Sequence, residues 1–261
     1  GYVGLSIATL LAQHNEVVAV ASIGIQGVQV DTILHTQQLQ AGQNLSGEIH
    51  FKGSNSDKSI KGIYLQLMTS AEVESGDSEF TQSLCIAQWH ISGAFELKAN
   101  QVHQFPIHLQ LPFETPITEV QCRRNSTRVW LHTHLDIDWG IDATDKDFLN
   151  ILPTTCMQNF LVSMQQCGFN LATVDVEKGQ LRGNGFQSTI GCYQELEFKP
   201  NAMFSGINEV EVSFVAEAHQ THVLLEVDRT FRGDGFKSMT IPHHLASVQN
   251  IVHEIKRTLS L

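Results

Sequence analysis

The sequence predicts an all-β protein built from two antiparallel β-sandwich domains. From Val28 onward the pattern is dominated by short segments in which apolar and polar residues alternate. This period of two is that of a strand with one buried side and one solvent-facing side. Clusters of Gly, Ser, Asn and Pro separate the segments, and almost no helical pattern lies between them. That arrangement is typical of antiparallel pairing.

Residues 1–21 do not fit this pattern. The stretch GYVGLSIATLLAQHNEVVAV resembles the amino-terminal fragment of a UDP-glucose dehydrogenase, with Gly1 and Gly4 as the last two glycines of a dinucleotide-binding turn. The strand and the first glycine of that turn are missing, and Ala21 stands where an acidic residue would bind the ribose. We therefore expect a remnant or fusion segment, helical over about residues 2–14, rather than an NAD site.

The first sandwich domain is expected at residues 22–150. Its strands are predicted from four alternating segments, residues 47–53, 61–69, 105–113 and 128–138. Stretches rich in turn-forming residues separate them, among them AGQN, KGSNSDKS and ESGDS. The acidic stretch IDATDKDF that follows is interpreted as a loop.

A single helix is predicted near the middle of the chain, in PTTCMQNFLVSMQQCG (residues 153–168). Pro153 suits the first turn of a helix and Gly168 suits its carboxyl end. One apolar stripe runs along it at helical spacing, formed by Met157, Phe160, Leu161 and Met164. We expect this helix to pack on a sheet edge or at the domain junction.

The second sandwich domain is expected at residues 151–240, with the helix leading into it. Its strands are predicted at residues 170–178, 192–200, 208–217 and 221–230. A carboxyl-terminal helix follows at 241–261, after Pro242, with its apolar residues near one face. That face is expected to dock on the protein's own surface. Binding to a partner or peripherally to a membrane remains the alternative, although the polar face carries only two basic residues.

Two similar turns are predicted within the second domain, at LRGNGFQST (181–189) and FRGDGFKSM (231–239). Asn-Gly and Asp-Gly favour the positive φ angles of tight hairpins. The two turns are either structural or present Arg182 and Arg232 as a paired recognition surface.

Several long stretches, in order along nearly the whole chain after Ala21, resemble the bacterial sporulation-control (stage-zero M) family. They include LQAGQNLSGEIHFKGSNSDKSIKGIYLQL (39–67), STRVWLHTHLDIDWGIDATDKDFLNILPT (126–154) and LLEVDRTFRG (224–233). The resemblance implies an arrestin-like fold, in which two β-sandwich domains share a central polar connection. It also implies a cytosolic, non-enzymatic regulatory protein that acts through protein partners. No catalytic residue is carried over with it.

Composition excludes several other classes of protein. Sixteen basic and 27 acidic residues give a net charge of −11, which repels phosphate backbones and argues against nucleic-acid binding. The longest apolar run is shorter than the roughly 20 residues of a transmembrane helix, and we see no secretion signal. Five cysteines without a C-x-x-C pair suggest reduced thiols in the cytoplasm. No cofactor is expected.

The best metal candidate is HTHLDID. On a strand, His132 and His134 share one face, with Asp136 two residues further on. Imidazole and carboxylate suit zinc or a related metal. However, same-face residues stand about 7 Å apart on a strand, and an exposed alternating face explains the same letters.

A second cluster consists of charged groups. Asp142, Asp145 and Asp147 lack the central Gly and the terminal Glu of a calcium loop. We expect them instead to pair with basic residues at the domain junction, the candidates being Arg123, Arg124, Arg128 and Lys146.

The function predicted from the sequence is that of an arrestin-like adaptor. It would bind protein partners of open identity through sheet edges, loop tips and the carboxyl-terminal helix, and the same edges would permit homo-oligomers. A metal-binding regulatory module, using His132 and His134, is the alternative. An NAD-linked dehydrogenase fragment is a distant third. No G-x-S-x-G or Walker-type motif is present in the sequence.

Overall fold

The computed structural model describes residues 27–75, 78–201, 206–230 and 233–261. The predicted amino-terminal segment, with its helix at residues 2–14, therefore lies outside the described residues, as does Arg232. In the part that is described, no helix is long and apolar enough to cross a membrane.

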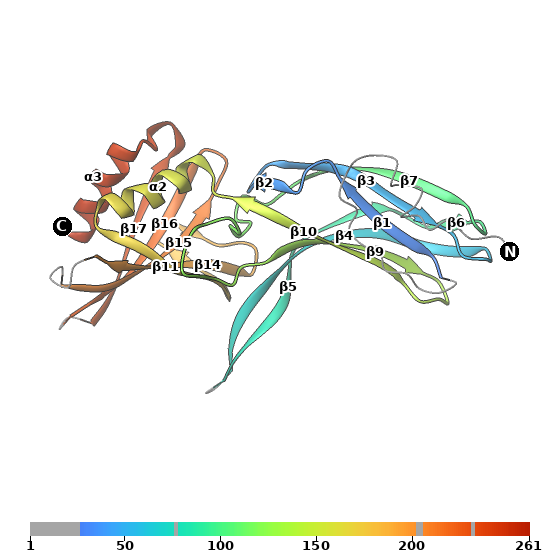
Figure 1. Cartoon of the computed structure of the whole chain (residues 1–261), viewed down its shortest axis with the longest axis horizontal. Coiled ribbons are helices and arrows are strands. Elements are labelled where there is room, and N and C mark those ends of the chain that lie inside the picture. Colours follow the sequence, from blue (N-terminus) through green and yellow to red (C-terminus); the bar gives the residue numbers. More distant parts are fainter. Residues whose placement is uncertain (1–26, 76–77, 202–205, 231–232) are drawn as a thin grey trace.

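Strands dominate the chain, as the sequence predicts (Figure 1). The first half contains β1 (Gln29–Leu34), β2 (Gln38–Gln40), β3 (Asn44–Lys52), β4 (Lys58–Ser75), β5 (Ser78–Ser92), β6 (Phe95–Leu97), β7 (Val102–Gln110), β8 (Arg124–Asn125), β9 (Val129–Ile137) and β10 (Ala143–Leu152). The second half contains α2 (Thr155–Gln166), β11 (Phe169–Lys178), β12 (Arg182–Gly183), β13 (Phe186–Gln187), β14 (Cys192–Pro200), β15 (Ile207–Ala216), β16 (Gln220–Arg229), β17 (Gly233–Pro242), a 3-10 turn (His243–Leu245) and α3 (Val248–Leu259).

The first domain is a sandwich of two sheets. One sheet has the order β1-β3-β7, and the other contains β5, β4, β9, β10 and β2. The inward residues of both sheets form one apolar core, which includes Ile49, Phe51, Leu65 and Leu131, each without exposed surface. Alternation along β3 and β9 produces this core, because every second side chain points between the sheets.

The prediction of a loop at IDATDKDF (residues 141–148) is wrong. Residues 143–152 form β10, which pairs antiparallel with β9 from Ala143–Leu135 to Leu149–Val129. Every second residue of β10 is buried, so the strand does alternate. However, aspartates occupy the inward positions 145 and 147. The sequence of this strand therefore lacks the apolar residues by which a buried strand face is predicted.

The second half combines a main sheet and the small β12–β13 hairpin with two helices. The strands run in the order β17-β16-β15-β14-β11, and α2 and α3 lie together against one face of this sheet (Figure 1). Its core joins helix residues such as Phe160 and Ile255 to sheet residues such as Leu196 and Val212, all fully buried. The all-β class is confirmed, and the layer facing this sheet is made of helices.

Both helices have well-formed amino ends. The Thr154 hydroxyl accepts a hydrogen bond from the Met157 amide (3.3 Å), and the Ser247 hydroxyl accepts one from Asn250 (3.3 Å). The apolar face of α3 is buried within its own domain, because Ile251, Ile255 and Leu259 are at most 1% exposed. This is the expected docking on the protein's own surface, and it leaves these three side chains unavailable to a membrane or a partner.

The two halves are joined through both strands and side chains. β4 bridges β11 at Glu72 and Glu177, and β8 pairs parallel with β11. At this junction the buried Gln194 amide accepts a hydrogen bond from the Ile117 amide (2.8 Å). It also donates to the Ile117 carbonyl (2.7 Å) and to the Thr127 hydroxyl (2.8 Å). The polar connection at this point is thus an uncharged amide.

We expect Gln194→Leu to lower the free energy of unfolding by about 1–3 kcal/mol. Leucine is of similar size, but it would leave the main-chain N–H and C=O of Ile117 without their hydrogen-bond partner. Urea unfolding measures this loss. Gln187→Leu, at an exposed position, is the matched control. A loss no larger than that of the control would contradict a structural role for the amide.

One of the two similar turns has the expected geometry. β12 and β13 pair around Asn184 and Gly185, and Gly185 has a φ of +83°. The prediction of a turn at Asp234 and Gly235 is wrong. These residues lie within β17 and pair with Asp228 and Val227. The chain reverses earlier, between Arg229 and Gly233.

Candidate functional site

Three buried carboxyl groups meet where the two sheets of the first domain approach each other. Asp31 comes from β1, and Asp145 and Asp147 come from β10; their exposed fractions are 3%, 5% and 2%. We call them the seam cluster. Asp145 Oδ2 accepts a hydrogen bond from the Thr32 amide (2.7 Å), which ties the two strands together. Beside it, the Thr32 and Thr133 hydroxyls share a hydrogen bond of 2.5 Å.

The seam cluster has strongly raised pKa values. Burial, with the nearby charges of Asp145 and Asp31, raises the pKa of Asp147 to about 8. Burial and the charge of Asp145 raise the pKa of Asp31 to about 6, against the opposing influence of His50 on β3. Among the described residues Asp147 Oδ2 has no hydrogen-bond partner. Because ionisation is costly in this setting, Asp147 keeps its proton near neutral pH.

The expected pairing of these aspartates with arginines does not form among the described residues. Asp142 bonds instead to His134 Nε2 (2.8 Å) and to the Ile137 amide (2.9 Å). The Ile137 bond is the main reason that the pKa of Asp142 lies below its usual range. Arg128 donates to its neighbour's carbonyl, at Thr127 (3.1 Å). The charged junction network was a wrong prediction, because Asp145 and Asp147 point into the first domain.

His132 and His134 do lie on one face of β9, with their rings stacked 6.3 Å apart. His132 Nδ1 contacts Gln66 Oε1 (3.2 Å), and His134 contacts Asp142. The ligand atoms of His132, His134 and Asp136 do not converge on a common point in the described structure. The geometry therefore does not assemble the metal site that the sequence suggested there.

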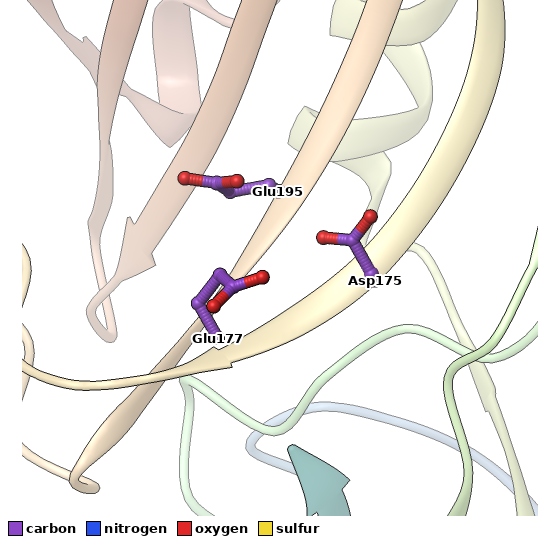
Figure 2. A group of neighbouring side chains, drawn as sticks. All are labelled: Asp175, Glu177 and Glu195. Atoms are coloured by element: carbon purple, nitrogen blue, oxygen red, sulfur yellow. The ribbon is translucent and has the colours of Figure 1, made fainter. Parts of the chain in front are cut away.

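The outer face of the second sheet is strongly acidic. Figure 2 shows Asp175 and Glu177 of β11 beside Glu195 of β14, with one oxygen from each within 4.8 Å of the others. Neighbouring strands add further carboxylates, at Glu197, Glu209, Glu211, Glu226 and Asp228. Burial, with the charges of Glu211 and Glu177 next in size, raises the pKa of Glu195 to about 8. A retained proton thus relieves the crowding of like charges here.

One cation on this acidic face is Lys199. Lys199 contacts both Glu197 and Glu209. Arg182 bonds to Gln180 Oε1 (2.8 Å). Because Arg232 lies outside the described residues, a recognition surface formed by the two arginines stays a prediction.

The loop between β9 and β10 exposes two large apolar side chains, a feature that sequence reasoning missed. Trp139 is 97% exposed and Ile141 is 93% exposed. The loop is nevertheless well held: Asp142 binds the Ile137 amide, Asp138 binds Lys61 (3.0 Å), and the Asp138 amide donates to Ser59 (2.9 Å). Trp139 itself has a φ of +52°, which is rare for a bulky residue.

The comparisons with known proteins agree with one another. The sequence model of the family described as SpoOM protein matches residues 18–231. The sporulation-control protein spo0M of Bacillus subtilis (strain 168) is 32% identical over 215 residues, which are 82% of this chain and 80% of that protein. The crystal structure of Spo0M from B. subtilis matches with a TM-score of 0.80 at 26% identity, covering 90% of this chain and 99% of that one. The arrestin-like fold class is thereby confirmed, and the chain belongs to the SpoOM protein family.

Proposed function

We propose that this chain is a non-enzymatic adaptor that regulates by binding another protein in the bacterial cytoplasm. Its family supports a regulatory role, since the relative from B. subtilis is named for sporulation control. The observation that carries the adaptor function is the loop between β9 and β10, in which Trp139 and Ile141 stand almost fully in solvent.

An exposed tryptophan on an ordered loop is a good anchor for a protein interface. Such residues contribute much of the binding energy when a partner's pocket removes them from water. The loop does not need to become ordered on binding, because Asp138 and Asp142 already hold it through Lys61 and the Ile137 amide.

Charge next to the anchor indicates the kind of partner. Asp136, Asp138 and Asp142 flank the two apolar side chains, with Lys61 as the neighbouring cation. The complementary surface is an apolar pocket with a basic rim. An anionic membrane would be repelled by the same carboxylates.

We expect Trp139→Ala to weaken partner binding at least tenfold, because loss of a central tryptophan anchor costs about 2 kcal/mol or more. The partner is first captured with the wild-type chain and purified, and its affinity is then measured by titration calorimetry. Leu245→Ala removes another exposed apolar residue, 50% exposed, and is the matched control. Equal affinities for the two variants would refute this loop as the binding site. If the wild type bound anionic vesicles and Trp139→Ala did not, the loop would be a membrane-binding site, and the proposal of a protein partner would be wrong.

A further inference from the structure

The outer edge of β5 is open. Among the described strands β5 pairs only with β4, and no hydrogen bond from its main chain reaches another element in the described structure. The β4–β5 hairpin also projects away from the body of the protein (Figure 1). An open edge of this length is a ready template for a further strand.

This edge lacks the usual protection against pairing. Residues 80–92, FTQSLCIAQWHIS, contain no Asp, Glu, Lys, Arg or Pro. Proteins normally protect outer strands with charges or proline. Two other outer strands of the described sheets show this protection, with Pro106 in β7 and Lys237 in β17. Two register shifts interrupt the edge. One is at Ile86, where Leu67 pairs with Ala87 and Met68 with Cys85, and the other is at Ile91, where Ile63 pairs with Ser92 and Tyr64 with His90.

Several apolar side chains of β5 are also partly exposed to solvent. Leu84, Trp89 and Ile91 face the first core yet stay only partly buried, because none of the described strands lies beyond β5. Cys85 and Gln88 are exposed. A further strand in the sheet would remove the first group from water and leave the second on the outer face.

We propose that the β5 edge pairs antiparallel with β5 of a second copy of this chain, forming a two-fold symmetric dimer through a continuous sheet. Identical antiparallel edges are self-complementary under a two-fold axis. At a net charge of −11, two copies repel over most of their surface, and residues 80–92 let them meet without like charges in contact.

The pattern of burial selects one register. Inward residues must lie opposite inward residues, and the uncharged stretches must overlap. With Leu84 opposite Trp89 of the second copy, inward residues meet inward residues, and residues 81–92 of the two copies lie opposite each other, which is all of the uncharged stretch except Phe80. In that register Cys85 lies opposite Gln88 of the second copy, and this pair occurs twice across the two-fold axis.

Charge substitutions at this pair test the dimer. The double variant Cys85→Lys, Gln88→Lys places like charges opposite each other and weakens dimerisation at least tenfold. The matched variant Cys85→Lys, Gln88→Glu places opposite charges there and keeps the wild-type dissociation constant within about threefold. Both positions are exposed, so circular dichroism should show intact folding. Sedimentation equilibrium of the full chain measures the constants.

A disulfide tests the register independently. Under mild oxidation Gln88→Cys should yield a covalent dimer through Cys85 of the second copy, and adding Cys85→Ser should abolish it. A wild-type chain that sediments as a monomer at about 100 μM overturns the proposal. So does a dimer that both charge variants leave unchanged. Trp139→Ala should leave the dimer intact. The two proposals are therefore tested separately: absence of the dimer would not contradict the adaptor function, and unchanged partner binding by Trp139→Ala would not contradict the dimer.

Discussion

Replacing Asp147 with asparagine is expected to stabilise the first domain at pH 8, by on the order of 4 kcal/mol. In the folded protein this buried carboxyl has a pKa of about 8, well above the 3.8 of an unperturbed aspartate. The folded state therefore holds a proton that the unfolded chain releases above about pH 4. Asparagine has the same shape and no charge, so it removes that cost at high pH and changes little at pH 5.

The same proton makes the wild-type protein less stable as pH rises. Between pH 5 and 7 the folded state binds more protons than the unfolded state, so the free energy of unfolding falls with pH. One retained proton gives at most about 1.4 kcal/mol per pH unit, and we expect on the order of 1 from Asp147. Asp31, with its pKa of about 6, adds to the slope at the lower end of this window.

Urea titrations at pH 5, 6, 7 and 8 measure the effect. Asp147→Asn should flatten the slope. The control Asp138→Asn alters a partly exposed ion pair with Lys61, and should change stability by no more than about 1 kcal/mol at any pH. An unchanged slope in Asp147→Asn would show that the proton resides elsewhere.

Sequence patterns predict most strands but miss β10, where two inward positions are aspartates. Strands β9, β11 and β14 were found from their alternation, and their inward residues are buried. β10 was missed because Asp145 and Asp147 take inward places, which a pattern of apolar residues cannot represent. All of β5 and the outer end of β4 are also absent from the predicted strands. Two register shifts within β5, at Ile86 and Ile91, break its alternation. Where the hairpin projects from the body, no core exists to impose an apolar period.

The candidate sites show the same limit. The nearness of His132 to His134 followed from strand geometry, but the partners of each ring depend on β4 and on the loop after β9. Trp139 lies in the run LDIDWG, and its exposure could not be inferred because tryptophan is usually well buried. Asp31 joins Asp145 across 114 positions of sequence, a contact that only the pairing of two sheets creates.

The carboxyl-terminal helix provides the second large effect. Ile255→Ala is expected to destabilise the second domain by about 2–5 kcal/mol, through lost burial and the cavity left behind. Ile255 is fully buried in the core that α3 shares with α2 and the sheet. His253→Ala, on the exposed side of the same helix, is the matched control and should change stability by less than about 0.5 kcal/mol.

Hydrogen exchange distinguishes a structural helix from a binding helix. The first domain has its own core, in which no residue of α3 takes part. Ile255→Ala should therefore speed exchange at amides of β14, β15 and β16 and leave β3 and β9 unchanged. If Ile255→Ala matched His253→Ala in both stability and exchange, the face of α3 would contribute nothing to the fold, and a role in binding partners would have to be considered again. A structural helix and a partner-binding helix have the same amphipathic sequence pattern. Only the surface that covers the apolar face of the helix distinguishes the two roles.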